Sequence, residues 1–390
     1  MKVNIFCFIG FLMTTITSSS KEMNLGFQSA CNIKERIIFK PYVDVFKQTD
    51  TIKVDSLTNK VCVYGIDSLT DGAGGSSYRE YFDPVWKSVF SSSELGYVWF
   101  NLRDAKNQGL SYKVSTNMIP MISAKDYSVA PIKYSLCGKG VFTKDGDGSD
   151  YITLDTKGAE FARFRIYYLQ QPGGGTFSLG FSNTESRHLT NVNSEGVLEL
   201  KFIEVEKNAS DTSIISIKRI TGELAFFCVR FMKDEKNSAS VCNIAKGGMK
   251  MEQINELDRT FRQQWYSEIN PELLLLNAGA NDQKSVNGIT LKTWLGNYIN
   301  DVKLGSPNCK IVLVQPNQTS SWRTDFSAEH LIIRKELSLE KGVEFFNTIE
   351  IVGDYKFFVE NEMMGDGTHP NKKGFRIIAE NYLHFLGITN

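Results

Sequence analysis

The chain has 390 residues, of which 42% are hydrophobic, and this length is enough for about two or three domains with their own cores. Its 44 Lys and Arg residues balance 44 Asp and Glu residues, so the formal net charge is +0. Nucleic acids and anionic membrane surfaces attract proteins with a basic excess. The charge balance therefore argues against either as the main partner.

The first residues have the order of an export signal. Lys2 is followed by an apolar stretch over 3–16 and then by small polar residues over 17–20. This order is typical of a secretory signal peptide, and its apolar part is too short for a stable membrane anchor. We expect an exported protein, periplasmic or secreted, with no membrane insertion after cleavage of the signal. A buried or disordered N-terminal segment is the alternative.

The remaining cysteines do not form a metal or redox motif. They are widely spaced, at Cys31, Cys62, Cys137, Cys228, Cys242 and Cys309. No Cys-x-x-Cys or His-x-x-x-His pair occurs, and neither does a phosphate loop or a dinucleotide fingerprint. We expect core thiols, no metal and no cofactor.

In chain order, the hydrophobic pattern changes twice. An apolar strand over 60–64 and a helix over 78–90 come first. From about 113 to 236, short runs alternate apolar and polar residues, as in 198–202, and Gly-rich turns separate them; this indicates an antiparallel sandwich. After 237, apolar runs over 239–244, 273–277, 310–315 and 343–347 alternate with helical stretches over 251–268, 289–303, 327–341 and 372–386. Buried strands separated by helices indicate a parallel sheet with helices on both faces.

The order of these regions predicts an α/β domain that an antiparallel β-sandwich interrupts. We expect a signal peptide over 1–20, an extension and the first part of the α/β domain over 21–112, the sandwich over 113–236, and the second part of the α/β domain over 237–390.

Three loops of the expected parallel sheet hold side chains with catalytic potential. Ligands of such sheets bind at the carboxyl ends of the strands. The loops are Asp67-Ser68-Leu69-Thr70-Asp71-Gly72, Gly279-Ala280-Asn281-Asp282 and Asp366-Gly367-Thr368-His369-Pro370. Each alone is typical of a turn or a helix cap. Together they bring a hydroxyl, an amide donor and an Asp-x-x-His pair to one edge of the sheet.

These residue types fit acyl transfer. A serine hydroxyl such as that of Ser68 is a poor nucleophile until an imidazole accepts its proton, and His369 is the candidate base. Asp366 would orient that imidazole and stabilise its charged form.

An oxyanion then needs fixed donors. The Asn281 side chain, the Ser68 N–H and the N–H of a glycine in 247–248 are the candidates. Gly248 is the expected donor and Gly247 the alternative, although both glycines could merely form the turn.

The combination of these loops resembles the four sequence blocks of the SGNH (GDSL-type) hydrolases, which are esterases and lipases with a flavodoxin-like fold. The resemblance covers about 60–110 and 238–390. It implies Ser68, His369 and Asp366 as the catalytic triad. One position departs from the pattern: Ile66 stands where the family has glycine, and Gly65 lies one residue earlier. Because a β-branched residue disfavours positive φ, we expect a different backbone path in the nucleophile loop.

The inserted sandwich resembles the arrangement of exported peptidoglycan O-acetylesterases, in which a carbohydrate-binding-like module interrupts the hydrolase domain. This resemblance implies removal of O-acetyl groups from a polysaccharide, with peptidoglycan as the first candidate, through an acetyl-Ser68 intermediate. Tyr167 and Tyr168 are candidate sugar-stacking side chains, although either one could belong to the core. The alternatives are a polysaccharide O-acetyltransferase with the same triad, a lipase or esterase for other acyl esters, and a binding protein whose α/β part is only a scaffold.

Overall fold

The computed structural model describes residues 60–388, except 73–75, 91, 93, 124, 144–149, 182–189, 234–238, 284 and 321–323. The expected signal peptide and the extension that follows it lie outside the described residues, as does Cys31. The described residues all belong to one compact unit, Asp50–Asn390.

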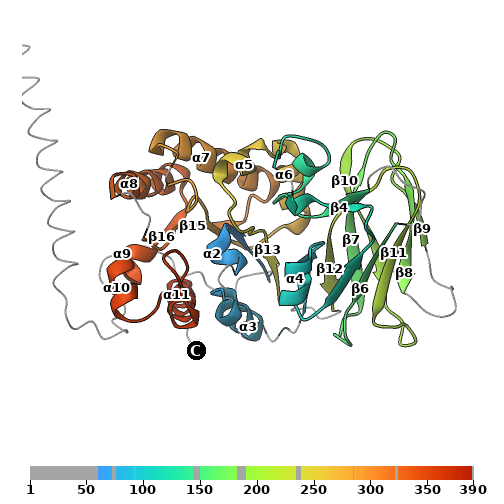
Figure 1. The fold of residues 1–390 in the computed structure, drawn as a ribbon, viewed down its shortest axis with the longest axis horizontal. Helices are drawn as coiled ribbons and strands as arrows, with labels where there is room; N and C mark the ends of the chain where they lie inside the picture. The colour runs from blue at the N-terminus through green and yellow to red at the C-terminus, as the bar shows by residue number, and fades with distance from the viewer. Residues whose placement is uncertain are drawn as a thin grey trace, which may run out of the picture. The chain divides into compact units, whose positions relative to one another are not determined.

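A five-stranded parallel sheet forms the centre of the α/β part (Figure 1). Its strands are β1 (Lys60–Ile66), β13 (Ala239–Asn243), β14 (Leu273–Asn277), β15 (Lys310–Gln315) and β16 (Glu344–Asn347). The order β13-β1-β14-β15-β16 is the flavodoxin-like order 2-1-3-4-5. Most of the strand residues are buried apolar side chains, as a sheet covered on both faces requires. The expected α/β fold is confirmed.

Helices pack on both faces of this sheet. On one face lie α3 (Arg79–Val89) and α11 (Lys372–Phe385); on the other lie α5 (Met251–Glu256), α6 (Arg259–Ile269), α7 (Gly288–Gly305) and α8 (Thr324–Lys341). The shorter helices are α2 (Ser68–Asp71), α4 (Leu102–Asn107), α9 (Thr348–Ile351) and α10 (Tyr355–Glu360). The helix expected over 251–268 is two helices, because the Asp258 carboxylate accepts the Phe261 N–H at 3.0 Å and starts α6.

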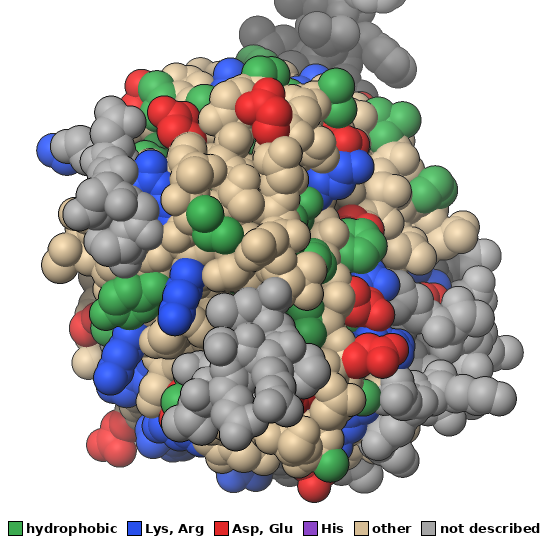
Figure 2. Space-filling model, turned by 90° about the vertical axis from the view of Figure 1, so that its right-hand side faces the viewer, with side chains coloured by type: hydrophobic (Ala, Val, Ile, Leu, Met, Phe, Trp, Pro, Cys, Tyr) green, Lys and Arg blue, Asp and Glu red, His purple; other side chains and the backbone are tan. Residues whose placement is uncertain are grey.

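Two antiparallel sheets form the inserted region and enclose a core of their own, so the expected β-sandwich is confirmed. The strands of one sheet are β2 (Gly96–Trp99), β4 (Met118–Pro120), β5 (Val141–Thr143), β7 (Arg163–Gln170), β10 (Glu199–Glu206) and β12 (Ala225–Met232). Those of the other are β3 (Ser111–Val114), β6 (Tyr151–Asp155), β8 (Thr176–Phe181), β9 (Thr190–Asn193) and β11 (Ile214–Thr221). On the sandwich side shown in Figure 2, charges of both signs are interspersed.

The sandwich begins earlier than the expected boundary at 113. β2 pairs with β12, and β3 pairs with β6 from Ser111 onward. The strand β2 is only four residues long and is buried throughout. A short strand that is buried on both faces has no apolar–polar alternation, so the sequence pattern did not reveal it.

Of the two roles considered for Tyr167 and Tyr168, the structure supports the core position and not sugar stacking, because both side chains are buried. The Tyr167 ring lies 5.4 Å from the Trp265 ring of α6, and its hydroxyl donates to Glu268 at 3.1 Å. Tyr168 packs in the sandwich core, 5.3 Å from the Phe177 ring. The sheet that carries both tyrosines is covered on one face by the second sheet and on the other by α6. In β7, the alternation of side chains along the strand therefore does not indicate that one face is exposed to solvent.

The cysteines of the described residues are buried thiols, without a disulfide among them: Cys62, Cys137, Cys228, Cys242 and Cys309. Burial raises their pKa, to about 12 for Cys137, which makes these thiols poorly reactive. Among the described helices, none combines the length and the hydropathy that a membrane span requires.

Gly65 provides a test of how closely β1 and β13 pack. A Cβ at Gly65 would lie 2.6 Å from Ile244 Cγ1 and 3.0 Å from the Ala245 nitrogen. We predict that Gly65→Ala lowers the free energy of unfolding by about 1–3 kcal/mol, measured by urea denaturation. Gly296 of α7 is the control, because its added Cβ would have only ordinary contacts. Gly296→Ala should raise stability by about 0.5–1 kcal/mol. Equal effects of the two substitutions would contradict this packing account.

Candidate active site

Ser68 begins helix α2 directly after the carboxyl end of β1. The Asp67 carboxylate caps this helix and accepts the Leu69 N–H at 3.1 Å. Ile66 is the last residue of β1 and has no positive φ. The nucleophile loop therefore does not need glycine at that position, and the nearby Gly65 is required by strand packing instead.

The three residues expected to form a triad lie in one chain of hydrogen bonds. Ser68 Oγ lies 3.0 Å from His369 Nε2, and His369 Nδ1 lies 3.0 Å from Asp366 Oδ2. The Ser68 residue is 7% exposed, whereas the Asp366 side chain is 54% exposed. The base and its carboxylate thus lie at an open rim, next to a nearly buried hydroxyl.

The loop before α11 holds the carboxylate in place. Asp366 Oδ1 accepts the backbone N–H groups of Thr368 and His369, both at 2.6 Å, and a bridge between Met364 and Pro370 closes the loop. Partial burial raises the pKa of Asp366, but the hydrogen bonds from His369 and Thr368 outweigh it and lower this pKa to about 2. Asp366 is therefore ionised near neutral pH and favours the His369 tautomer with a proton on Nδ1.

The loop after β13 separates the two candidate glycines. The Gly247 N–H donates to Asp71 Oδ2 at 2.9 Å and is therefore engaged. Within the described residues, the Gly248 N–H has no acceptor, and the same holds for the Ser68 N–H at the start of α2. Gly248 has a φ of +75°, which favours glycine, and no atom lies within 4 Å of its absent Cβ. Of the two glycines, Gly248 is therefore the one whose N–H is available to bind an oxyanion.

Asn281, in the loop after β14, connects this loop to the loop after β13. Its Nδ2 donates to the Met249 carbonyl at 2.9 Å, which uses one of its two N–H bonds and fixes the side chain. The neighbouring Asp282 carboxylate accepts the Met251 N–H at 2.9 Å, at the start of α5. Two adjacent side chains after β14 therefore hold the loop after β13. Asn281 is predictable from the sequence as a donor, whereas the part played by Asp282 depends on its contact with Met251 and has no sequence signal beyond its place beside Asn281.

A buried charge behind the site was also missed. Arg334 of α8 is fully buried and donates to the Ala278 carbonyl at 2.6 Å. Burial raises the pKa of Asp67 to about 7, although the Leu69 hydrogen bond and the Arg334 charge act in the opposite direction. In the sequence, the only sign of the Arg334 charge is a single arginine on the buried side of the helix expected over 327–341.

No group of three or more His, Cys, Asp or Glu side chains within the described ranges is arranged to hold a metal ion. The residues brought together at the strand ends are instead a hydroxyl, an imidazole, a carboxylate and N–H donors. This set can perform acyl transfer by nucleophilic catalysis.

Comparison with known proteins supports the fold assignment. A solved peptidoglycan O-acetylesterase aligns over 85% of this chain and 91% of its own, with a TM-score of 0.63 and 13% identity. A family two carbohydrate esterase from Cellvibrio japonicus aligns over 72% and 98%, with a TM-score of 0.31 and 10% identity. The psychrotrophic esterase EstA from Pseudoalteromonas sp. aligns over 40% and 78%, with a TM-score of 0.32 and 16% identity. No protein-family model and no curated protein matches the sequence. The chain has the fold of this peptidoglycan O-acetylesterase, a flavodoxin-like α/β part with an inserted antiparallel β-sandwich.

The raised pKa of Asp67 predicts a pH-dependent stability. Between pH 4 and 7 the folded state keeps a proton that the unfolded state releases, so stability falls as pH rises through this window. Asn at this position can cap α2 without a charge. We predict that the difference in the free energy of unfolding between Asp67→Asn and the wild type grows in favour of the variant from pH 4 to 8. The increase should reach up to about 4 kcal/mol, measured by urea denaturation. A stability difference that does not change with pH would contradict a perturbed Asp67.

Proposed function

We propose that this protein is a serine esterase that acts through an acyl-Ser68 intermediate. The observation that carries the proposal is the continuous hydrogen-bonded chain from Ser68 through His369 to Asp366, at the carboxyl ends of the parallel strands. The N–H groups of Ser68 and Gly248, which lack acceptors within the described residues, are the candidate oxyanion donors.

The geometry suggests the course of the reaction. As Ser68 Oγ attacks the ester carbonyl carbon, His369 Nε2 accepts its proton and Asp366 stabilises the imidazolium. The N–H groups of Ser68, Gly248 and Asn281 stabilise the negative oxygen of the tetrahedral intermediate. The protonated His369 then donates to the leaving alcohol, and the acyl group remains on Ser68. His369 next accepts a proton from the water that attacks the acyl carbon, and it returns this proton to Ser68 Oγ as the acid leaves.

The proposed substrate is an O-acetylated polysaccharide, with peptidoglycan as the first candidate. The likeness to a peptidoglycan O-acetylesterase spans both the α/β part and the inserted sandwich. The half-exposed Asp366 opens the site to solvent, which suits a small acetyl group on an extended sugar chain better than a long acyl tail. The apolar segment in 1–20 supports export, so the protein would act in the periplasm or outside the cell.

The first test is the release of acetate from O-acetylated peptidoglycan, with acetylated xylan in parallel. We predict that Ser68→Ala and His369→Ala each lower the turnover by roughly 10³-fold or more, because the nucleophile or its base is lost. Ser88→Ala and His384→Ala are the matched controls, since both residues are exposed and lie in α3 and α11. The controls should keep wild-type turnover.

Each outcome of this test is informative. Near-normal turnover by a folded Ser68→Ala variant would contradict the esterase mechanism. Hydrolysis of a small acetyl ester without acetate release from either polymer would refute the substrate assignment and leave the esterase intact. Transfer of acetyl to an added sugar, in place of release to water, would identify an O-acetyltransferase.

A further inference from the structure

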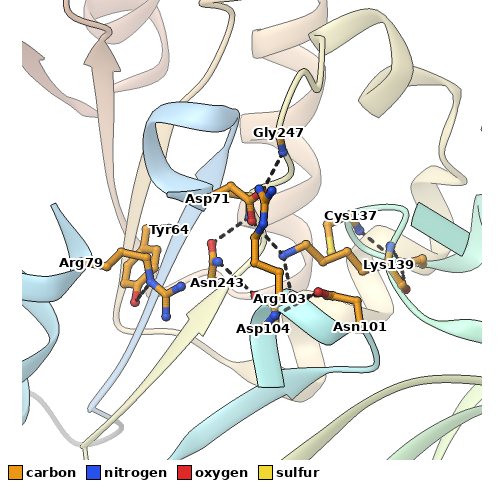
Figure 3. A network of polar contacts seen from close by, with 12 residues as sticks. Tyr64, Asp71, Arg79, Asn101, Arg103, Asp104, Cys137, Lys139, Asn243 and Gly247 are labelled. Atoms are coloured by element: carbon orange, nitrogen blue, oxygen red, sulfur yellow. Dashed lines mark hydrogen bonds and ion pairs between the residues drawn. The ribbon is translucent and has the colours of Figure 1, made fainter. Parts of the chain in front are cut away.

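Asp71 is a buried carboxylate at the end of α2, three residues after Ser68. Its Oδ2 atom accepts the Gly247 N–H at 2.9 Å and also accepts a hydrogen bond from Arg103 at 2.5 Å (Figure 3). Asp71 therefore connects the helix that carries the nucleophile to the loop that carries Gly248. The proposed mechanism gives this residue no part in the reaction.

The inserted region supplies the cation behind Asp71. Lys139 lies between the 3-10 helix η3 (Ile132–Tyr134) and β5, and its side chain is 0% exposed. Its Nζ lies 2.7 Å from Asp104 Oδ2 and 3.7 Å from Asp71 Oδ1. Figure 3 shows Lys139 reaching from the sandwich side towards both carboxylates. Asn243, at the end of β13, donates to the same Asp104 at 3.3 Å.

Lys139 is charged in this setting. Burial alone would lower its pKa, but the Asp104 and Asp71 carboxylates raise this pKa above its usual value. Two buried carboxylates without a cation between them would repel each other, and an unpaired buried charge is costly. The solvent-exposed Arg103 is a weaker partner because water screens it. Arg103 makes the shorter contact with Asp71, at 2.5 Å, whereas Lys139, at 3.7 Å, is the fully buried cation of this cluster.

In the loop after β13, the buried side chains of Ala245 and Met249 pack in the core, but the two glycines between them have no side chain to pack. No atom lies within 4 Å of an ideal Cβ at Gly248, and glycine has a wide range of backbone conformations. The Gly247 N–H bond to Asp71 fixes one peptide of this loop, and Asn281 fixes the Met249 carbonyl at 2.9 Å. The Gly248 N–H lies between these two anchors. Loss of the Asp71 anchor would let the peptide rotate away from the position of the oxyanion.

We propose that Asp71 is a positioning residue for the oxyanion donor Gly248, and that Lys139 of the inserted region holds Asp71 in place. The sandwich is then a part of the catalytic apparatus and not a separable binding module. This inference rests on the proposed esterase function. It assigns no new chemical step, because Asp71 and Lys139 act only through the orientation of one peptide.

The test compares the full-length variants Asp71→Ala, Asp71→Asn and Lys139→Met on 4-nitrophenyl acetate. It also measures their affinity for a trifluoromethyl ketone that mimics the tetrahedral intermediate. We predict that Asp71→Ala lowers kcat about ten- to a hundred-fold, with KM nearly unchanged. The reason is that the Gly248 N–H stabilises only the transition state, and the substitution moves this donor out of place. The affinity for the ketone should fall by a similar factor. Asp71→Asn keeps an acceptor oxygen and should lose less.

The role of Lys139 is tested by non-additivity. Lys139→Met should lower kcat in the wild-type background but have little further effect in the Asp71→Ala background, because both residues act through one peptide. Additive losses would overturn the part assigned to Lys139. If Lys139→Met does not fold, Lys139→Arg, which keeps the charge but changes its geometry, replaces it in the same cycle.

Asp301→Asn is the matched control for the loss of a buried ion pair. Asp301 of α7 is fully buried and pairs with Arg259 and Arg262, away from the strand ends. This variant should lower the thermal midpoint without changing kcat or the ketone affinity. A folded Asp71→Ala variant with wild-type kcat and ketone affinity would overturn the inference. Absence of esterase activity in the wild type would instead refute the proposed function.

Discussion

The site depends on the parallel pairing of β1 with two strands that come much later in the sequence. β1 pairs with β13 on one side and with β14 on the other. The carboxyl ends of the three strands are therefore neighbours, and their loops provide Ser68, Gly248 and Asn281. In the strand order, the next strand lies on one side of β1 and the later strands lie on its other side. At such a point a crevice opens at the carboxyl ends of the strands. The close approach of Gly65 to Ile244 is one packing condition for this arrangement.

The same pairing explains where the sandwich is placed. The chain leaves the parallel sheet after α3 and must return as β13, directly beside β1. The inserted region therefore starts and ends beside the amino end of β13, where Ser92 donates to the Ala239 carbonyl, at the opposite end of this strand from the loop that carries Gly248. Lys139 and Asp104 of α4 are nevertheless buried beside Asp71, at the carboxyl end of β13, where Asn243 donates to Asp104. A region that joins the sheet at the opposite edge can thus reach the loops of the candidate site and hold one of them in place.

The sequence allowed much of this structure to be predicted, because buried parallel strands are continuous apolar runs. The bounds of β14 and β15 agree with the predicted runs over 273–277 and 310–315. Ser68, Asp366 and His369 were found because their residue types have a shared chemistry at strand ends. That these residues form a catalytic triad remains a proposal, although the structure places them within hydrogen-bond distance of one another.

Two of the missed features depend on contacts between distant parts of the chain, and a third depends on one local cap. Tyr167 follows an alternating pattern, and only the packing of α6 on its sheet buries it. The bond between Asp71 and Gly247 joins residues 176 positions apart, and no local pattern in the sequence indicates it. The break between α5 and α6 is a local cap at Asp258 within a continuous helical pattern. Tertiary packing and single capping bonds decide these cases, and propensity does not report them.

The identity of the nucleophile is tested most directly by covalent trapping. A fluorophosphonate reacts with a serine that a neighbouring imidazole activates, and mass spectrometry of the digested protein identifies the modified residue. The account predicts a single adduct on Ser68, formed far more slowly in the His369→Ala variant. An adduct on another residue, or none on a folded protein that hydrolyses acetyl esters, would contradict it.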